Sequence, residues 1–190
     1  ASYTAVAEAA ESALDSYLLK PFAASSLAAR LLEARKRKRI LREIFTAIES
    51  GEFADAARLC LTRFQQKAPY WLYAARIGAE LLLRLGQHEA AQKMYQAVID
   101  ANALPWAKLG IARSQLESGK VQQARRTLEV LIAEDPSHTD AYDVMGRVHI
   151  EQGSLNEALD TYRMATQLTP GSIERLQRQG MLAFYLGEHA

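Results

Sequence analysis

Glycines recur along this chain at almost constant intervals, and this periodicity restricts the fold more than any other feature. The five are Gly51, Gly86, Gly119, Gly153 and Gly187, with successive separations of 35, 33, 34 and 34 residues. An alanine follows each of the first four glycines by five positions, and a mostly small residue precedes each glycine by seven. A fixed period of roughly 20 to 50 residues is typical of arrays in which one structural unit stacks on the next.

Each period is interpreted as a pair of antiparallel helices. A first helix ends at the glycine turn, a second helix follows, and a proline such as Pro136 or Pro170 ends the unit. The spacing from Ser154 to Glu157 predicts a capping box at the start of one second helix. The chain has only 10 Gly and 5 Pro in 190 residues, which disfavours turn-rich β architectures. The sequence therefore predicts an all-α fold.

The repeat resembles the tetratricopeptide repeat family. The pattern of that family is occupied by Tyr142, Gly146, Gly153, Ala158, Tyr162, Ala165 and Pro170. The resemblance implies a right-handed superhelical solenoid of antiparallel helix pairs over residues 37–190, with about four and a half repeats, preceded by an N-terminal helical segment. A single pair cannot bury its own apolar face, and about three stacked units make a stable array.

The last half repeat places apolar residues where no further helix follows in this chain. They are Leu182, Phe184, Tyr185 and Leu186. Terminal units normally carry a polar outer face. We therefore expect either a truncated array or burial against another copy. Self-association through this half repeat or through the N-terminal segment is a second expectation.

The segment from Asp15 to Phe22, DSYLLKPF, resembles the last part of a two-component receiver domain. The resemblance implies that Lys20 contacts a phosphoryl group, that Tyr17 changes rotamer on activation, and that the bond before Pro21 is cis. The phosphoacceptor aspartate of such a domain lies upstream of this motif, so we expect residues 1–36 to be a truncated receiver-like segment with a connector helix. The alternative is an N-terminal helix unrelated to receivers. In either case the apolar spacing predicts helix as far as about Leu19.

No helix breaker occurs from Ser26 to Ser50, so we expect one continuous connector helix there. Its apolar stripe is interrupted by a basic collar of Arg35, Lys36, Arg37, Lys38 and Arg39. We interpret the collar as a solvated bridge between two packed ends. The sharper alternative is a contact with an acidic partner or with nucleic acid. The formal net charge of the whole chain is +1, so nucleic acid is not the expected partner.

In the resembled family the first helices of successive units line a concave groove, and we expect a protein or peptide partner there. The mapped groove residues on which we concentrate are Tyr73, Arg76, Arg84, Trp106, Arg113 and Arg147; the same mapping includes Glu80, Asp140 and Asp143. Arginine and aromatic side chains recognise carboxylates and apolar groups. Trp106 is the expected anchor, with packing between units as the alternative. The carboxylate clamp of chaperone-binding relatives requires Lys and Asn, whereas this chain has Leu41, Phe45 and Glu80 there.

No catalytic or cofactor motif accompanies the repeat. The four histidines show no metal-ligand spacing, and Cys60 occupies a packing position, so neither an enzyme nor a cofactor is expected. The N-terminus lacks the pattern of a signal peptide and no apolar run could span a bilayer, so we expect a cytoplasmic protein with no membrane partner.

The preferred function is the output region of a receiver-fused signalling protein in a phosphorelay, acting by protein binding. The alternative is a plain repeat scaffold in a bacterial assembly such as a secretion or pilus system.

Overall fold

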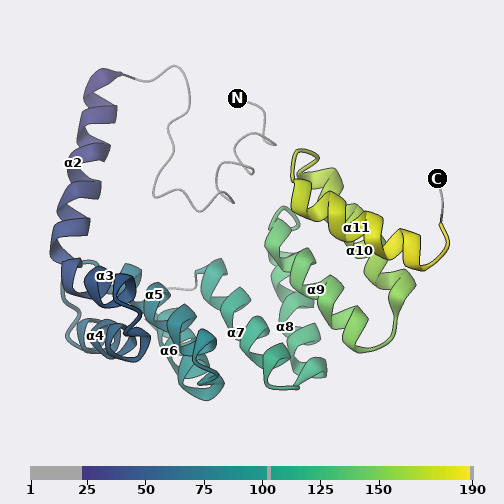
Figure 1. Cartoon of the computed structure of the whole chain (residues 1–190), viewed down its shortest axis with the longest axis horizontal. Coiled ribbons are helices and arrows are strands. Elements are labelled where there is room, and N and C mark those ends of the chain that lie inside the picture. The colour runs from purple at the N-terminus through teal and green to yellow at the C-terminus, as the bar shows by residue number, and fades with distance from the viewer. Residues whose placement is uncertain (1–22, 102–103, 189–190) are drawn as a thin grey trace. The chain divides into compact units, whose positions relative to one another are not determined.

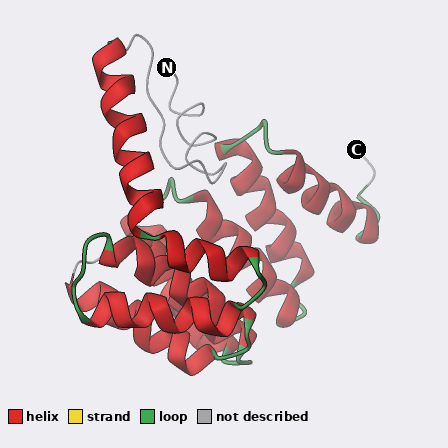
Figure 2. Cartoon of the chain, turned by 60° about the vertical axis from the view of Figure 1, so that its left-hand side comes forward, coloured by secondary structure: helices red, strands yellow, loops and turns green. Residues whose placement is uncertain are grey.

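The computed structural model describes residues 23–101 and 104–188, and every regular element in these residues is an α-helix (Figures 1 and 2). The helices are α2 (Ala24–Ile40), α3 (Arg42–Glu49), α4 (Phe53–Gln65), α5 (Trp71–Arg84), α6 (His88–Ala101), α7 (Pro105–Glu117), α8 (Val121–Glu134), α9 (Thr139–Glu151), α10 (Leu155–Leu168) and α11 (Ile173–Tyr185). The described chain forms two compact units, one ending at Ser114 and one beginning at Gln115. The all-α prediction is confirmed.

The predicted glycine turns join the helices into pairs, which are, from first to fourth, α3 and α4, α5 and α6, α7 and α8, and α9 and α10. All five periodic glycines have positive φ, between 71° and 77°, a backbone conformation that L side chains adopt at a cost. At the end of α9 the N–H of Gly153 donates to the carbonyl of Ile150 at 2.9 Å. The N–H of Ser154 donates to the carbonyl of His149, also at 2.9 Å. This pair of hydrogen bonds is the Schellman motif, which ends the first helix and reverses the chain.

The same turn explains why the predicted capping box does not form. Ser154 is the N-cap of α10, as expected, but its side chain makes no capping hydrogen bond. In a capping box, Glu157 would accept a bond from the backbone N–H of Ser154. That N–H is already bonded to His149 across the turn. The helix start was therefore predicted correctly, and the bonds that define it were not.

Close packing between helices depends on small residues opposite large ones. A Cβ atom added to Gly146 of α9 would lie 2.4 Å from the Tyr162 ring of α10. A Cβ atom on Gly110 of α7 would lie 2.2 Å from the Tyr95 ring of α6. Tyr95 and Tyr162 are buried, so each ring occupies the space that a side chain would need. At these two contacts a glycine of one helix therefore faces a tyrosine of the neighbouring helix.

The prediction of one continuous helix from Ser26 to Ser50 is wrong. Leu41 separates α2 from α3 and has φ −96° and ψ 14°, outside the helical region. Its side chain is completely buried beside Ile44, Cys60 and Ala74. Arg63 of α4 donates from Nη2 to the carbonyl oxygen of Ile40 at 3.3 Å. Burial of Leu41 and the bond from Arg63 together account for the break.

The expected packing of the connector holds at its C-terminal end, where Leu41 and Ile44 are 0% and 2% exposed. Packing of the other end against residues 1–22 lies outside the described residues. No residue of α2 is buried, and Leu27, Leu31 and Leu32 are 40%, 56% and 66% exposed. The C-terminal part of α2 is held to α5 through Tyr70, whose hydroxyl donates to Glu33 at 2.5 Å. The predicted receiver-like residues Tyr17, Lys20 and Pro21, and the helix expected up to Leu19, lie outside the described residues.

Candidate functional site

The second and third helix pairs bring together four of the residues mapped to the groove. Arg76 and Glu80 lie one turn apart on α5, and Trp106 and Arg113 lie on α7. Arg76 and Glu80 are exposed, whereas Trp106 and Arg113 are half-buried. We refer to these four residues as the α5–α7 face. They all belong to the compact unit that ends at Ser114.

Glu80 is the centre of this face. Its Oε1 accepts a hydrogen bond from the Tyr95 hydroxyl at 2.9 Å and lies 3.8 Å from Nη1 of Arg113. Burial, followed by the charge of Glu80, raises the pKa of the Tyr95 phenol well above its usual value. Tyr95 therefore remains a hydrogen-bond donor at neutral pH, and this bond holds the Glu80 carboxylate in place from the buried side of the face. The repeat pattern does not predict this contact.

Trp106 combines the two roles that the sequence left open. Its ring meets the Tyr95 ring edge-on, with centroids 6.2 Å apart and planes at 68°, so it packs between helix pairs. The guanidinium of Arg76 lies 5.7 Å from the Trp106 centroid, within the range of a cation–π contact. Because Trp106 is only half-buried, part of the indole remains accessible beside an exposed cation.

The remaining predicted groove residues lie apart from this cluster. Tyr73 is covered by Arg37 of the basic collar, whose guanidinium is 4.5 Å from its ring centroid. Arg84 lies 4.5 Å from the ring centroid of Phe53 in the first pair. Arg147 is exposed on α9 of the other unit. The groove prediction is untested as a binding site, and the structure groups only Arg76, Trp106 and Arg113.

The members of the basic collar differ in exposure. Arg37 is half-buried against Tyr73, whereas the other four members are exposed; these are Arg35, Lys36, Lys38 and Arg39. The periodicity gave no signal for this stacking contact. It also gave none for Lys67, whose ammonium lies 3.7 Å from the Trp71 centroid.

Two acidic residues mapped to the groove are used for structure instead. The guanidinium of Arg175 on α11 is only 5% exposed and lies 2.7 Å from Asp143 and 3.0 Å from Asp140, both on α9. A further bond of 2.7 Å runs from Nη1 of Arg175 to the hydroxyl of Thr169. Asp143 therefore belongs to a buried ion-pair network, which sequence reasoning missed because it considered each groove residue alone.

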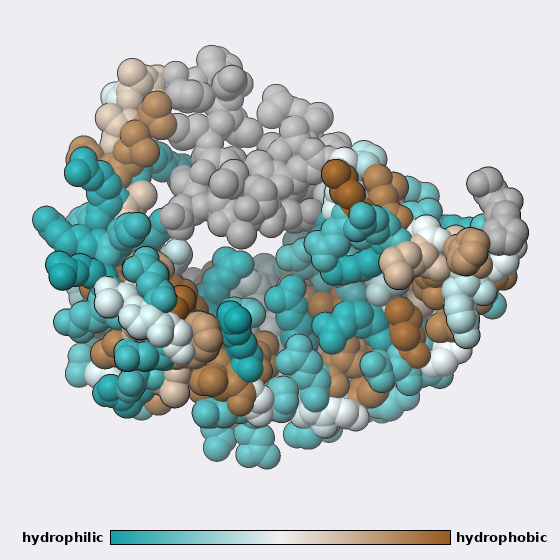
Figure 3. All heavy atoms as spheres, viewed as in Figure 1, coloured by the Kyte–Doolittle hydropathy of each residue, from teal (hydrophilic) through white to brown (hydrophobic). Residues whose placement is uncertain are grey.

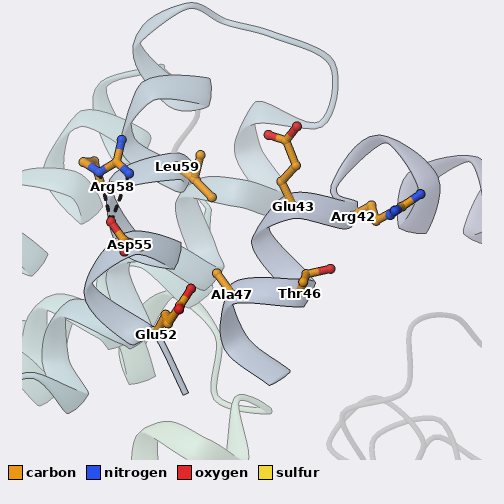
Figure 4. A pocket seen from close by; sticks show the side chains of 8 residues that line it. All are labelled: Arg42, Glu43, Thr46, Ala47, Glu52, Asp55, Arg58 and Leu59. Atoms are coloured by element: carbon orange, nitrogen blue, oxygen red, sulfur yellow. Dashed lines mark hydrogen bonds and ion pairs between the residues drawn. The ribbon is translucent and has the colours of Figure 1, made fainter. Parts of the chain in front are cut away.

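Other features of the described residues offer less chemistry. A pocket of about 390 Å³ lies between α3 and α4 and has charged side chains of both signs, with Arg58 paired to Asp55 (Figure 4). No three His, Cys, Asp or Glu side chains among the described residues could hold a metal ion. Burial raises the pKa of the Cys60 thiol to about 12, so the reactive thiolate is suppressed at neutral pH. None of the described helices combines the length and apolarity needed to cross a membrane.

Sequence comparison identifies the repeat directly. The chain matches the tetratricopeptide repeat family over residues 82–147 and, overlapping, over residues 115–179. Together these matches span more than half of the chain. The chain belongs to the tetratricopeptide repeat family.

Among curated relatives, BBSome complex member BBS4 of Mus musculus is 29% identical over 109 residues, which are 55% of this chain and 20% of that protein. Superkiller complex protein 3 of Mus musculus is 25% identical over 58% of this chain and 7% of its own length. The chain thus spans a fifth or less of these two relatives.

Two solved structures share the fold. The MamA fragment 41-end from Desulfovibrio magneticus RS-1 has a TM-score of 0.61 at 18% identity, covering 80% of this chain and 86% of that one. The first repeat domain of Spaghetti (RPAP3), bound to the HSP90 peptide SRMEEVD, has a TM-score of 0.55 at 20% identity, covering 60% of this chain and 94% of that one. The predicted solenoid of antiparallel helix pairs is confirmed.

Proposed function

We propose that this chain is a protein-interaction scaffold and that its α5–α7 face binds a protein or peptide partner. The observation that carries this proposal is the arrangement around Glu80. The Glu80 carboxylate is held by the buried Tyr95 and lies beside Arg113, while Arg76, one turn earlier on α5, lies over the half-buried Trp106. Such a preorganised face reduces the entropy lost on binding.

The chemistry of this face favours a partner segment with a carboxylate next to an apolar side chain. Arg76 is exposed and can pair with a carboxylate through two N–H donors, while the indole of Trp106 offers an apolar surface beside it. Arg113 could exchange its 3.8 Å contact with Glu80 for a bond to the partner. Binding, and not catalysis, is the proposed activity.

The similar Spaghetti domain is bound to an HSP90 peptide, but we do not expect the same ligand here. At the clamp positions this chain has Leu41, Phe45 and Glu80. Leu41 is completely buried and Phe45 packs against the core of the first pair. None of these three side chains donates a hydrogen bond to a carboxylate, so the clamp cannot form.

The test is affinity capture with the intact chain and with two variants of the face, Trp106→Ala and Arg113→Glu. Partners recovered by the wild-type chain should be lost in both variants. A matched control is Arg58→Glu, because Arg58 lies on α4 away from this face. Equal recovery of the same partner by all variants would reject the proposed binding site.

We further propose that the chain is the output region of a receiver-linked phosphorelay protein in the cytoplasm. The support is the DSYLLKPF motif with Tyr17, Lys20 and Pro21, together with the exposed leucines of α2, which a neighbouring domain could cover. The test is beryllofluoride titration of the intact protein, which should alter partner affinity or oligomeric state. No change in either quantity would reject the phosphorelay link. An upstream reading frame without an acidic pair and a strand-end aspartate would favour the plain scaffold.

A further inference from the structure

Helix α2 is attached to the rest of its compact unit by few side chains. None of its residues is buried. Its N-terminal half carries exposed leucines and its C-terminal half carries the basic collar, and Figure 3 shows these two parts in brown and in teal. Burial of apolar surface is the main force that fixes one helix against another. Moving α2 away from the helix pairs therefore exposes little new apolar surface.

The C-terminal end of α2 is its fixed end. Leu41, directly after it, is completely buried and has φ −96° and ψ 14°. Arg63 of α4 donates from Nη2 to the carbonyl oxygen of Ile40 at 3.3 Å and from Nη1 to that of Pro69 at 3.0 Å. Motion of α2 about Leu41 leaves this buried side chain in place, so the break in the helix can serve as a pivot.

Two side-chain contacts hold α2 beyond this pivot. The Tyr70 hydroxyl donates to Glu33 at 2.5 Å, and the guanidinium of Arg37 lies 4.5 Å from the ring centroid of Tyr73. Glu33 and Arg37 are four positions apart, so both contacts are made from one side of α2. Tyr70 has φ 63°, and the only other described non-glycine residue with positive φ is Lys67 in the same loop. A backbone held in this region indicates a functional constraint.

The contact of Arg37 covers a ring that borders the α5–α7 face. Tyr73 lies three positions before Arg76 on α5, so these two side chains are neighbours on the helix surface. Aromatic rings beside arginines contribute strongly to binding at protein interfaces. In this structure Arg37 occupies the position over Tyr73 that a partner would need. The face is therefore smaller than its sequence permits.

We infer that α2 is an autoinhibitory latch, which keeps Arg37 over Tyr73 and so limits the α5–α7 face until α2 moves away from α5. This inference rests on the proposed function of that face, and it does not depend on the phosphorelay proposal. Neither of the two contacts that hold the latch is fully buried, so each contributes weakly and the latch opens readily. Opening adds the Tyr73 ring to the face and raises its affinity for a carboxylate next to an apolar side chain.

The first test measures whether α2 covers Tyr73 and needs no partner. Tetranitromethane nitrates accessible tyrosine rings, and mass spectrometry reads the rate at Tyr73. Tyr70→Phe removes only the hydroxyl that bonds Glu33, and it should accelerate nitration of Tyr73 by about threefold or more. The control is Arg39→Ala, because Arg39 is exposed on α2 and its loss should leave the rate unchanged. Equal rates in wild type and Tyr70→Phe would overturn the inference.

The second test measures whether opening the latch improves binding. The probe is the fluorescein-labelled peptide GSDFSG, in which an aspartate precedes a phenylalanine, and fluorescence anisotropy gives its affinity for the intact chain. Tyr70→Phe should bind this peptide about threefold or more tightly than wild type and Arg39→Ala do. Trp106→Ala in the Tyr70→Phe background should abolish the binding, which assigns it to the α5–α7 face.

The two tests separate failure of the latch from failure of the proposed function. Equal peptide affinities of wild type and Tyr70→Phe, both lost with Trp106→Ala, would overturn the latch and support the α5–α7 face as a binding site. Faster nitration of Tyr73 without peptide binding by any variant would support the cover by α2 and contradict the partner chemistry proposed for the face.

Discussion

Two sets of arginines, one in each compact unit, are used in opposite ways. In the unit that ends at Ser114, Arg76 and Arg84 lie over aromatic rings and remain exposed. In the unit that begins at Gln115, Arg175 is buried and bonded to Asp140, Asp143 and Thr169. The guanidinium groups of Arg76 and Arg84 therefore remain accessible to a partner, whereas that of Arg175 is buried in the structure of its unit.

The energetic consequences of the two arrangements differ. An exposed cation–π contact contributes about 0.5–1 kcal/mol, so its arginine can be redirected to a partner at little cost. Removing one member of a buried ion pair leaves an uncompensated charge and costs about 3–5 kcal/mol. We therefore expect substitution of Arg175 to lower stability, and substitution of an exposed arginine such as Arg76 to affect partner binding with little change in stability.

The largest expected effect is that of Arg175→Ala. This change leaves the carboxylate of Asp143, 14% exposed, without its buried partner. We expect α11 to lose about 3 kcal/mol or more of protection against local opening, measured by amide hydrogen exchange. The control is Arg178→Ala, because Arg178 is 39% exposed and should contribute about 1 kcal/mol or less. Equal losses in the two variants would contradict the burial argument.

The next effect compares Gly146 of α9 with Gly180, which lies at the equivalent position of α11. Gly146→Ala should lower the free energy of unfolding by about 2 kcal/mol, because the new methyl group overlaps the Tyr162 ring. Gly180→Ala meets no described atom and should raise stability by up to ~1 kcal/mol through helix propensity. Urea unfolding measures both changes. Two changes of the same sign would show that α11 is covered in solution as α9 is.

A smaller effect is expected in the pH dependence of the free energy of unfolding of the unit that ends at Ser114, which contains Cys60. Burial raises the pKa of Cys60 from 9.0 to about 12, so the unfolded state releases this proton first as pH rises. The stabilising contribution is fully present below about pH 9 and is lost between pH 9 and 12. Near pH 10 the loss is about 1 kcal/mol. Cys60→Ala should flatten the fall in unfolding free energy from pH 8 to 10, and an unchanged slope would show that other groups cause it.

The smallest effect is expected from Arg76→Ala. Its exposed contact with Trp106 should contribute no more than about 1 kcal/mol, so the thermal unfolding midpoint should barely move. If the α5–α7 face binds a partner, the affinity for that partner should nevertheless fall. If stability and affinity fell together, Arg76 would be required for the structure, as Arg175 is, and the two arginines would not differ in role.

Sequence reasoning predicted the parts of the structure that depend on local chemistry repeated at a fixed period. The glycine turns, the helix pairs and the tyrosine packing near Gly146 all follow from residues that recur about every 34 positions. The break at Leu41 was missed because it depends on Arg63, which is 23 positions from its acceptor Ile40, and on burial in the first pair.

The candidate site was only partly predictable for a similar reason. Mapping onto the repeat identified Arg76, Trp106 and Arg113 as members of one surface. It did not show that Tyr95 fixes Glu80, or that Arg175 binds Asp143 from the next repeat. Such contacts join side chains of different helices, and the period alone does not specify which polar groups meet.

Photo-crosslinking can show whether the α5–α7 face docks a partner, with p-benzoylphenylalanine placed at position 106 or, as a control, at the exposed position of Lys93 on α6. We predict that position 106 of the intact chain crosslinks a cellular protein, that Arg113→Glu abolishes this crosslink, and that position 93 does not capture the same protein. Equal crosslinking from both positions, or crosslinking unaffected by Arg113→Glu, would contradict docking at this face.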